Sequence, residues 1–460
     1  MQTAHVHPIG IQRRELLQVG FSLFAGLGLG QAIPTRAVAS PTSADVTRKK
    51  SGKAKQVILI FQTGAPSHID TFDPKPDAPA EIRGEFKAID TSIPGVKFGE
   101  HLPQLAARAH RMSVVRTFSH KDNNHTAATH HIITGALQPG VRFDKPLSRD
   151  DWPCYAGGVS FCNPPAEGIP AGVTLPTFLA EGPLVWPGQH GGFLGPKHDP
   201  WQIRKDPNKK GFSVENLSLP SGVTIDQLQN RVSLLDAVNR QQEWLGQVSD
   251  TRKLTDKQSQ AVALLTNGAV TKAFDIEREP SANRDKYGRH QFGQSILLAR
   301  RLIEAGVPIV QANMGHVQNW DSHNDNFKRL KNDLLPPFDR AVAALIDDLT
   351  QTGLINDVMV IAMGEFGRMP KIDLKNAGRD HWAPCFCGLF FGGGVHAGQV
   401  IGQSDATGSY PGTTPFNPDD LGATIYHTLG IEPSTELVDR TKRPVQLNRG
   451  RVIQSLFTGA

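Results

Sequence analysis

The chain has 460 residues, of which 38% are hydrophobic and 20% are charged, an ordinary composition for a globular protein. Its net charge of +5 comes from residues 1–55, which hold eight basic and two acidic residues and leave 41 basic and 42 acidic residues in the rest. The charge therefore gives no argument for nucleic-acid binding. The length allows one large α/β domain with insertions or two domains.

Residues 1–39 have the pattern of an export signal. Arg13 and Arg14 precede an apolar, glycine-rich run over 19–29, and Ala37-Val38-Ala39 is a small-residue site suited to signal peptidase. The pattern predicts twin-arginine export, so the partner would be that machinery and the location periplasmic or secreted. An ordinary secretory signal with a chance arginine pair is the alternative. The run is too short to span a bilayer, so no stable membrane insertion is expected.

Apolar runs predict the strands of a central sheet. The predicted strands are 56–61, 113–117, 308–313, 358–363 and a later strand and turn at 388–394. The run 358–363, VMVIAM, is apolar throughout, as in a strand buried on both faces of a parallel sheet. Between them, helices are predicted near 101–111, from about 125 to 134, over 224–305, and at 337–349 and 418–429.

This alternation predicts an α/β fold with a central, mostly parallel sheet and helices on both faces. The helix 337–349 would complete a right-handed βαβ unit with the strand 358–363. Residues 40–55, rich in Ser, Thr and Lys, are predicted to be a solvated linker before a single domain over 56–460. Within it, 144–290 is predicted to be a loop-rich and helical insertion, whose part rich in Pro and Gly covers the sheet.

Acidic and histidine side chains follow four of the predicted strands. In open α/β sheets, ligands bind beyond the carboxyl ends of the strands. Carboxylate and imidazole groups without a thiolate suit Zn, Mn, Mg or Ca. The predicted metal ligands are Asp321, His323, Glu365, Asp380 and His381, assisted by Asp70 or His68, while Asp73 is a further candidate. The alternative is that Glu365 pairs with Arg368 and that His381 is simply packed.

A helix start after the second predicted strand offers a place for an anion. Asp122, Asn123 or Asn124 could cap a helix beginning near His125, and free N–H groups at such an end attract negative charge. A metal here could polarise a phosphoryl or sulfuryl oxygen. The attacking group would be Thr126 or a water activated by the metal, and Arg368 or His125 would steady the anion.

The four cysteines, Cys154, Cys162, Cys385 and Cys387, include no C-x-x-C pair. In an exported protein one or two disulfides can form. A bridge between Cys154 and Cys162 is the simplest expectation, although the sequence does not assign one.

Several motifs along the chain resemble those of one protein family. They are the twin-arginine start, SHIDTFDPKPDAPAEIRGEF (67–86), GQSILLARRLIEAGV (293–307), WDSH (320–323), LPPFDRAVAALIDDL (335–349), MGEFGRMPKI (363–372) and GRDHW (378–382). Over nearly the whole chain they resemble the family known as domain of unknown function 1501. This resemblance implies an exported protein with the alkaline phosphatase and sulfatase-like fold.

Local matches to the wider superfamily are weaker. HTAATHHIITG (125–135) is similar to the helix that carries the sulfatase nucleophile, but no C-x-P-x-R or S-x-P-x-R occurs there. Gln62-Thr63-Gly64 stands where the superfamily places a metal-binding Asp, and Glu365 stands where it has an Asp-His pair. These departures put the two-metal site and the turnover of that superfamily in doubt.

Two functions are therefore carried forward. The first is an exported, metal-dependent, hydrolase-like protein acting on a phosphate or sulfate ester of a small molecule or a polysaccharide. The second is a non-catalytic ligand- or polysaccharide-binding accessory protein on the same fold. The clustered histidines and acids favour the first function, and the missing standard nucleophile favours the second.

Overall fold

An eight-stranded sheet organises the computed structural model of the protein, with the strand order β14-β4-β13-β10-β1-β9-β5-β8. The structure describes residues 54–140, 145–214, 267–315 and 319–459, with five single positions between 227 and 265. The strands of this sheet are β1 (Gln56–Phe61), β4 (Ser113–Phe118), β5 (Gly172–Leu175), β8 (Trp201–Gln202), β9 (Ile309–Asn313), β10 (Val358–Met363), β13 (Phe386–Phe391) and β14 (Gln399–Ile401).

Seven of these eight strands run in one direction. The neighbouring pairs are parallel except the two made by β13, which runs antiparallel to β10 and to β4. The chain passes from β10 to β13 without a helical crossover, and a parallel neighbour needs such a crossover. The predicted α/β class with a mostly parallel sheet is confirmed, and β13 is its one reversed strand.

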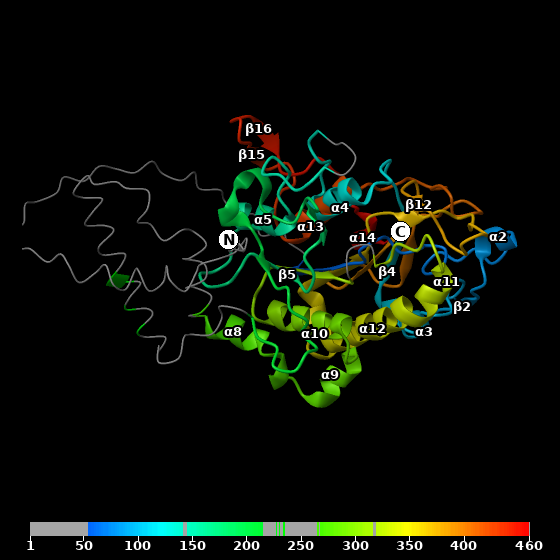
Figure 1. Cartoon of the computed structure of the whole chain (residues 1–460), viewed down its shortest axis with the longest axis horizontal. Coiled ribbons are helices and arrows are strands. Elements are labelled where there is room, and N and C mark those ends of the chain that lie inside the picture. The colour runs from blue at the N-terminus through cyan, green and yellow to red at the C-terminus, as the bar shows by residue number, and fades with distance from the viewer. Residues whose placement is uncertain are drawn as a thin grey trace, which may run out of the picture. The chain divides into compact units, whose positions relative to one another are not determined.

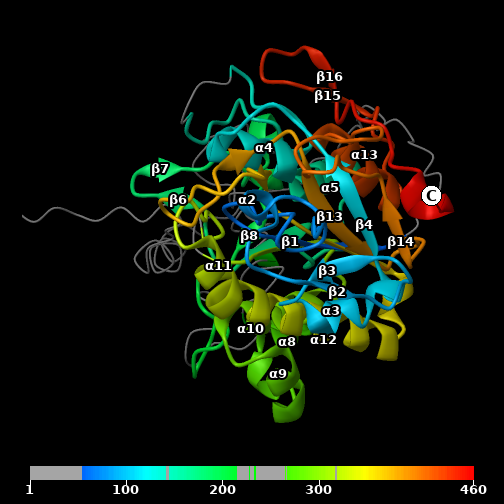
Figure 2. The same cartoon turned by 90° about the vertical axis from the view of Figure 1, so that its right-hand side faces the viewer.

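Helices cover both faces of the sheet. Figure 1 shows α4, α5 and α13 above it and α8, α9, α10 and α12 below it, and Figure 2 shows the same two layers after a quarter turn. These helices are α4 (His125–Thr134), α5 (Tyr155–Cys162), α8 (Gly268–Phe274), α9 (Ser281–Tyr287), α10 (Gln291–Glu304), α12 (Leu335–Gln351) and α13 (Pro418–Thr428). Shorter elements are α2 (Ala80–Arg83), α3 (Pro103–Ala106), α11 (Asn326–Arg329), α14 (Ser455–Thr458), and the strand pairs β2 (Ala88–Asp90) with β3 (Lys97–Gly99), β6 (Ala180–Glu181) with β7 (Leu184–Val185), β11 (Gly367–Arg368) with β12 (His381–Trp382), and β15 (Glu436–Val438) with β16 (Pro444–Gln446).

The two layers explain the uninterrupted apolar runs of the central strands. Along β10, Val360 belongs to the core shared with α10 and α12, whereas its neighbour Ile361 belongs to the core shared with α4 and α13. Because successive strand residues face opposite sides, a strand covered on both faces needs apolar residues at every position. All six residues of β10 are accordingly buried.

Two predicted segments differ from the structure. The expected helix 101–111 is broken into α3 and a 3-10 turn at Ala109–Arg111. Between them Arg108 forms a two-pronged ion pair with Asp347 of α12, with N–O distances of 3.0 and 2.7 Å. This ion pair, between residues far apart in the sequence, is found where the helix is interrupted. The sequence from 104 to 112 contains no Gly or Pro that would predict the interruption. The segment expected only to cover the sheet instead adds β5 and β8 to one edge, in strands too short to give a strong apolar signal.

The expected bridge between Cys154 and Cys162 is absent, and all four cysteines are free thiols. Cys154 caps the start of α5 and Cys162 is its last residue. Eight helical residues separate them by about 12 Å at 1.5 Å per residue. A disulfide needs Cα atoms within about 7 Å.

Some predictions fall outside the described residues. They include the signal over 1–39, almost all of the linker 40–55, most of the predicted helical segment 224–266, and His316. In the part of the chain that the structure describes, no helix combines the length and the apolar character that crossing a membrane requires.

Candidate metal centre

Four loops meet at one edge of the sheet. Strands β1, β4, β9 and β10 run in the same direction, so their carboxyl ends lie on the same side. The loop after β4 enters α4 at His125, the loop after β9 carries Asp321 and His323, and the segment after β10 carries Glu365 and reaches His381. Asn124 is the cap of α4 among the three predicted candidates, since its side chain accepts from the Ala127 N–H.

Asp321 lies at the centre of the resulting cluster. Its carboxylate oxygens are 3.4 Å from His125 Nε2, 3.4 Å from His381 Nε2 and 3.2 Å from His323 Nε2. The Nε2 atoms of His323 and His381 are 2.9 Å apart. Donor atoms of His125, Asp321 and His381 all lie within 4.8 Å of one another, a spacing at which they could hold a metal ion.

The other ring nitrogen of each histidine faces an acceptor. Nδ1 of His125 is 2.5 Å from Glu365 Oε1, and Nδ1 of His323 is 2.7 Å from Asp380 Oδ1. Nδ1 of His381 is 2.7 Å from the carbonyl oxygen of Asn123. Carboxylates and carbonyls only accept, so each Nδ1 is the nitrogen that carries the proton. In the neutral imidazoles the Nε2 lone pairs are then left for a cation, the usual arrangement of metal-ligating histidines.

Arg368 forms an ion pair with Asp321. It lies opposite His381 in the β11–β12 pair, is fully buried, and places Nη1 2.5 Å from Asp321 Oδ1. The same guanidinium donates through Nε to the carbonyl oxygen of Ala65, at 2.9 Å, and through Nη2 to that of Gly64. With its donors engaged in this way, Arg368 fixes Asp321 and the loop after β1, whereas the sequence suggested a role in steadying a bound anion.

The neighbouring carboxylates stabilise a positive charge at His125. Burial acts to lower the pKa of this histidine, but interactions with Asp321 and Glu365 outweigh burial and raise the pKa to about 9. Burial also opposes the ionisation of Asp321, yet contacts with His125 and His381 and the charge of Arg368 hold its pKa well below the usual range. A positive charge between these groups is therefore favoured, and a proton or a metal ion can supply it.

Two buried atoms of the cluster are left without a hydrogen bond. Among the described residues, His125 Nε2 has no hydrogen-bond partner of good geometry, and Asp321 Oδ1 has none apart from its ion pair with Arg368. Buried polar atoms in native proteins are nearly always satisfied, and a bound ion is one recognised explanation when protein groups do not satisfy them. The residues present therefore fit a bound cation.

The structure engages the other predicted site residues elsewhere. The Thr126 hydroxyl donates to Asn124 Oδ1 at 2.6 Å, so it takes part in the cap of α4. Asp70 forms a buried ion pair with Arg379, and His68 Nε2 is 2.7 Å from the carbonyl oxygen of Gly408.

The third candidate of the loop after β1 is also engaged away from the cluster. Asp73 pairs with Lys75 and Arg116, at 3.0 and 3.3 Å, and accepts a hydrogen bond from Ser404. Together with Asp70 and His68, it anchors this loop to its surroundings.

Two contributors were not anticipated from the sequence. Asn123 supplies a backbone carbonyl to His381, a role for which no side-chain pattern gives a signal. The indole of Trp186 stacks on the His125 ring, with centroids 5.8 Å apart and planes inclined by 22°. A tryptophan in a Pro- and Gly-rich loop was the available hint, since such residues often wall a binding site.

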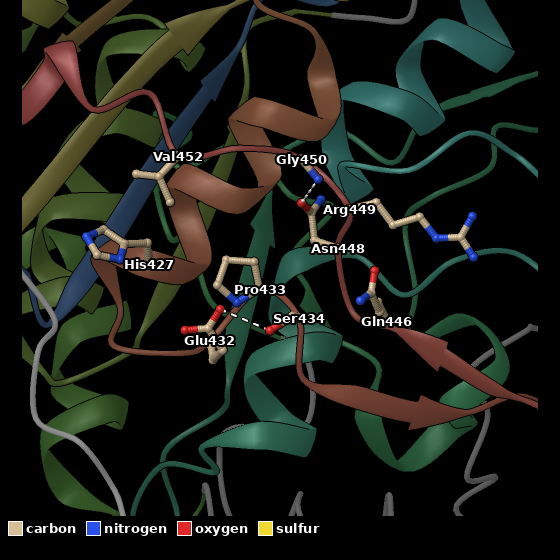
Figure 3. Close-up of a pocket in the computed structure, with 9 residues that line it drawn as sticks. All are labelled: His427, Glu432, Pro433, Ser434, Gln446, Asn448, Arg449, Gly450 and Val452. Carbon is tan, nitrogen blue, oxygen red and sulfur yellow. Dashed lines mark hydrogen bonds between the residues drawn. The ribbon is translucent and has the colours of Figure 1, made fainter.

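A polar cavity of about 330 Å³ lies away from this cluster (Figure 3). It is lined by His427 of α13 and by residues that follow this helix, among them Glu432, Asn448 and Arg449. Asn448 Nδ2 donates to the carbonyl oxygen of Gly135, at the carboxyl end of α4. The cluster sits at the other end of this ten-residue helix, about 15 Å away at 1.5 Å per residue. The cavity is therefore separate from the candidate metal centre.

The chain is similar to several known proteins and to one protein family. No curated protein matches the chain. Several solved structures resemble it. One is a protein in the alkaline phosphatase superfamily from Vibrio parahaemolyticus, which is 10% identical, with 83% of this chain and 67% of that chain covered and a TM-score of 0.35. Another is a phosphonate monoester hydrolase from Silicibacter pomeroyi, which is 13% identical, with 88% of this chain and 77% of that chain covered and a TM-score of 0.35. A third is the PsFucS1 sulfatase from Pseudoalteromonas sp., which is 12% identical, with 83% of this chain and 69% of that chain covered and a TM-score of 0.34. Residues 54–457 match the family described as "Protein of unknown function (DUF1501)", which confirms the resemblance found in the motifs. The chain belongs to the DUF1501 family.

Proposed function

We propose that this protein is a metal-dependent, hydrolase-like protein that acts on phosphate or sulfate esters. One observation carries the proposal: three histidines have Nδ1 held by an acceptor and Nε2 within 3.4 Å of the Asp321 carboxylate. The proposed ligands are His125, Asp321, His323 and His381. A set rich in imidazole favours Zn²⁺ over Mn²⁺, Mg²⁺ and Ca²⁺, which prefer oxygen ligands.

The chain's own groups have distinct tasks in this proposal. A cation bound here would supply Lewis-acid polarisation of an ester oxygen and would lower the pKa of a water. His323 and His381, whose side chains are 38% and 22% exposed, form the open side from which an ester group approaches. Glu365, which also accepts from the Gly64 N–H at 2.9 Å, orients His125. Thr126 donates to the neutral amide of Asn124, which cannot take its proton, so water is the proposed nucleophile.

The test is metal content followed by turnover. The mature protein would be analysed for bound metal and then assayed with aryl phosphates and aryl sulfates. We expect stoichiometric Zn and hydrolysis that a chelator abolishes and re-added metal restores. Hydrolysis unaffected by complete metal removal would refute the proposal.

A non-catalytic ligand- or polysaccharide-binding role is the second candidate. The observation that favours it is the engagement of Thr126 in the helix cap, which leaves the region without a protein nucleophile of the sulfatase kind. A protein that holds metal and binds sulfated or phosphorylated glycans, yet hydrolyses none of the esters, would establish this candidate.

Glu365→Gln is expected to weaken metal affinity by about 10–100-fold, because a neutral amide holds the His125 ring less firmly and makes it less basic. Zinc affinity would be measured by competition with a chromophoric chelator. Glu432→Gln is the matched control, since Glu432 is exposed beside the separate cavity. Equal zinc affinity in both variants would show that Glu365 does not orient His125 for metal binding.

A further inference from the structure

Two buried hydrogen-bond donors beside His125 have no acceptor. Trp186 and Thr129 are both 0% exposed. Neither Trp186 Nε1 nor Thr129 Oγ1 has a hydrogen-bond partner among the residues that the structure describes. An indole N–H can only donate, and a buried donor left unpaired is unfavourable. Such groups in a folded protein call for a specific explanation, such as a ligand atom that completes them.

Both donors lie along one face of α4. Trp186 stacks on His125, the first residue of the helix. Thr129 and Ile133 follow at intervals of four residues, so they share the face of His125. At the far end of this face, a methyl group placed on Gly188 would lie 2.9 Å from Ile133 Cγ1. The same methyl group would lie 3.1 Å from His130 Cα, so the segment 186–188 runs beside α4 from His125 to His130 and Ile133. Thr129 lies between these contacts along the helix.

The donors do not compete with the metal ligands. Both ring nitrogens of His125 are directed to carboxylates, Nδ1 to Glu365 and Nε2 to Asp321. Trp186 instead stacks on the imidazole, with ring planes inclined by only 22° and centroids 5.8 Å apart. A ligand atom held by Trp186 and Thr129 can therefore sit beside the candidate metal centre while all of its ligands stay in place.

We propose that Trp186 Nε1 and Thr129 Oγ1 form a binding subsite for an oxygen of a tetrahedral oxyanion, the chemistry shared by phosphate and sulfate esters. This inference rests on the proposed function and deepens it. Two uncharged donors suit an acceptor oxygen, and the amino-terminal end of α4 adds a partial positive charge on the same side. The subsite orients the anionic end of the ester against the candidate metal centre.

The test uses Trp186→Phe and Thr129→Val, which remove one donor each. Thr129→Val keeps the shape of the side chain, whereas Trp186→Phe also removes part of a buried ring. Inorganic sulfate and phosphate serve as separate probes, against chloride at equal ionic strength, in metal-loaded and in chelated protein. The thermal midpoint and the anion Kd are measured. Without the anion, we expect Thr129→Val to be at least as stable as the parent, because an unpaired buried donor has been removed, and Trp186→Phe to be less stable, because it leaves a cavity. The anion Kd of both variants is expected to rise about tenfold. The probe that shows the larger rise identifies the ester class.

Matched controls remove donors that already have partners. Trp152 Nε1 donates to the carbonyl oxygen of Leu447, and Thr134 Oγ1 donates to that of His130. Trp152→Phe and Thr134→Val are expected to lower the thermal midpoint and leave the anion Kd unchanged.

An unchanged anion Kd in Trp186→Phe and Thr129→Val overturns the subsite, whatever the metal content or turnover. Lower stability of the isosteric Thr129→Val with an unchanged Kd would assign the donors to a structural water, which also overturns it. An anion Kd that depends on Trp186 in a protein without metal or turnover supports the subsite and refutes the proposed hydrolase. The two failures are therefore distinguishable.

Discussion

Replacing Asp70 with alanine is expected to lower the free energy of unfolding by about 3–5 kcal/mol. Asp70 and Arg379 have fully buried side chains, and their two-pronged contact has N–O distances of 2.8 and 3.1 Å. Asn326 Nδ2 also donates to Asp70 at 2.8 Å. The truncation leaves the Arg379 guanidinium without its carboxylate in the interior, where an uncompensated charge is strongly unfavourable.

Urea unfolding of both proteins gives this difference directly. Asp90→Ala is the control, because the Asp90–Lys97 pair is exposed, and its loss should change stability by less than about 1 kcal/mol. The folded fraction of Asp70→Ala should keep its metal content. A loss of metal with unchanged stability would instead make Asp70 a ligand, as the sequence suggested.

Asp321→Asn is expected to lower metal affinity by more than the 10–100-fold range typical of a supporting residue, and to abolish metal-dependent hydrolysis. The change removes the one negative charge that three imidazoles and Arg368 share. The amide keeps the shape of the carboxylate, so far-ultraviolet circular dichroism should show the same fold.

Metal content and competition titrations measure the effect. Asp439→Asn serves as a comparison, because Asp439 follows β15 and its ion pair is with Arg443, an exposed side chain outside the cluster. Full metal content in Asp321→Asn would show that the ion, if present, is held elsewhere. Because the buried Arg368 loses its partner, the apo form of Asp321→Asn should also unfold at a lower temperature than the apo parent.

The central strands could be predicted because their signal is local. The bounds of 56–61 and 358–363 agree with β1 and β10, since a strand buried on both faces is apolar at every position. The direction of β13 could not be predicted, because it depends on how the chain returns from β10. The broken helix around Arg108 and the edge strand β5 likewise depend on partners far along the chain.

The candidate site was predictable in its members more than in their arrangement. Strand ends on one edge pointed to Asp321, His323 and His381, and the structure brings these three together with His125. The sequence could not distinguish residues that would bind the ion directly from carboxylates that instead face the Nδ1 atoms of the histidines. Glu365 faces Nδ1 of His125, because the position of each carboxylate is set by loops that come together only in the folded protein.

The origin of the ligands in three distant segments has a thermodynamic consequence. An unfolded chain does not hold His125, Asp321 and His381 near one another, so an ion would bind the native state selectively. Free ion at a hundred times its Kd would then add about 2.7 kcal/mol to the folding equilibrium. Metal supply would thus set the lifetime of the folded protein against proteolysis, and scarcity of the ion would shorten it.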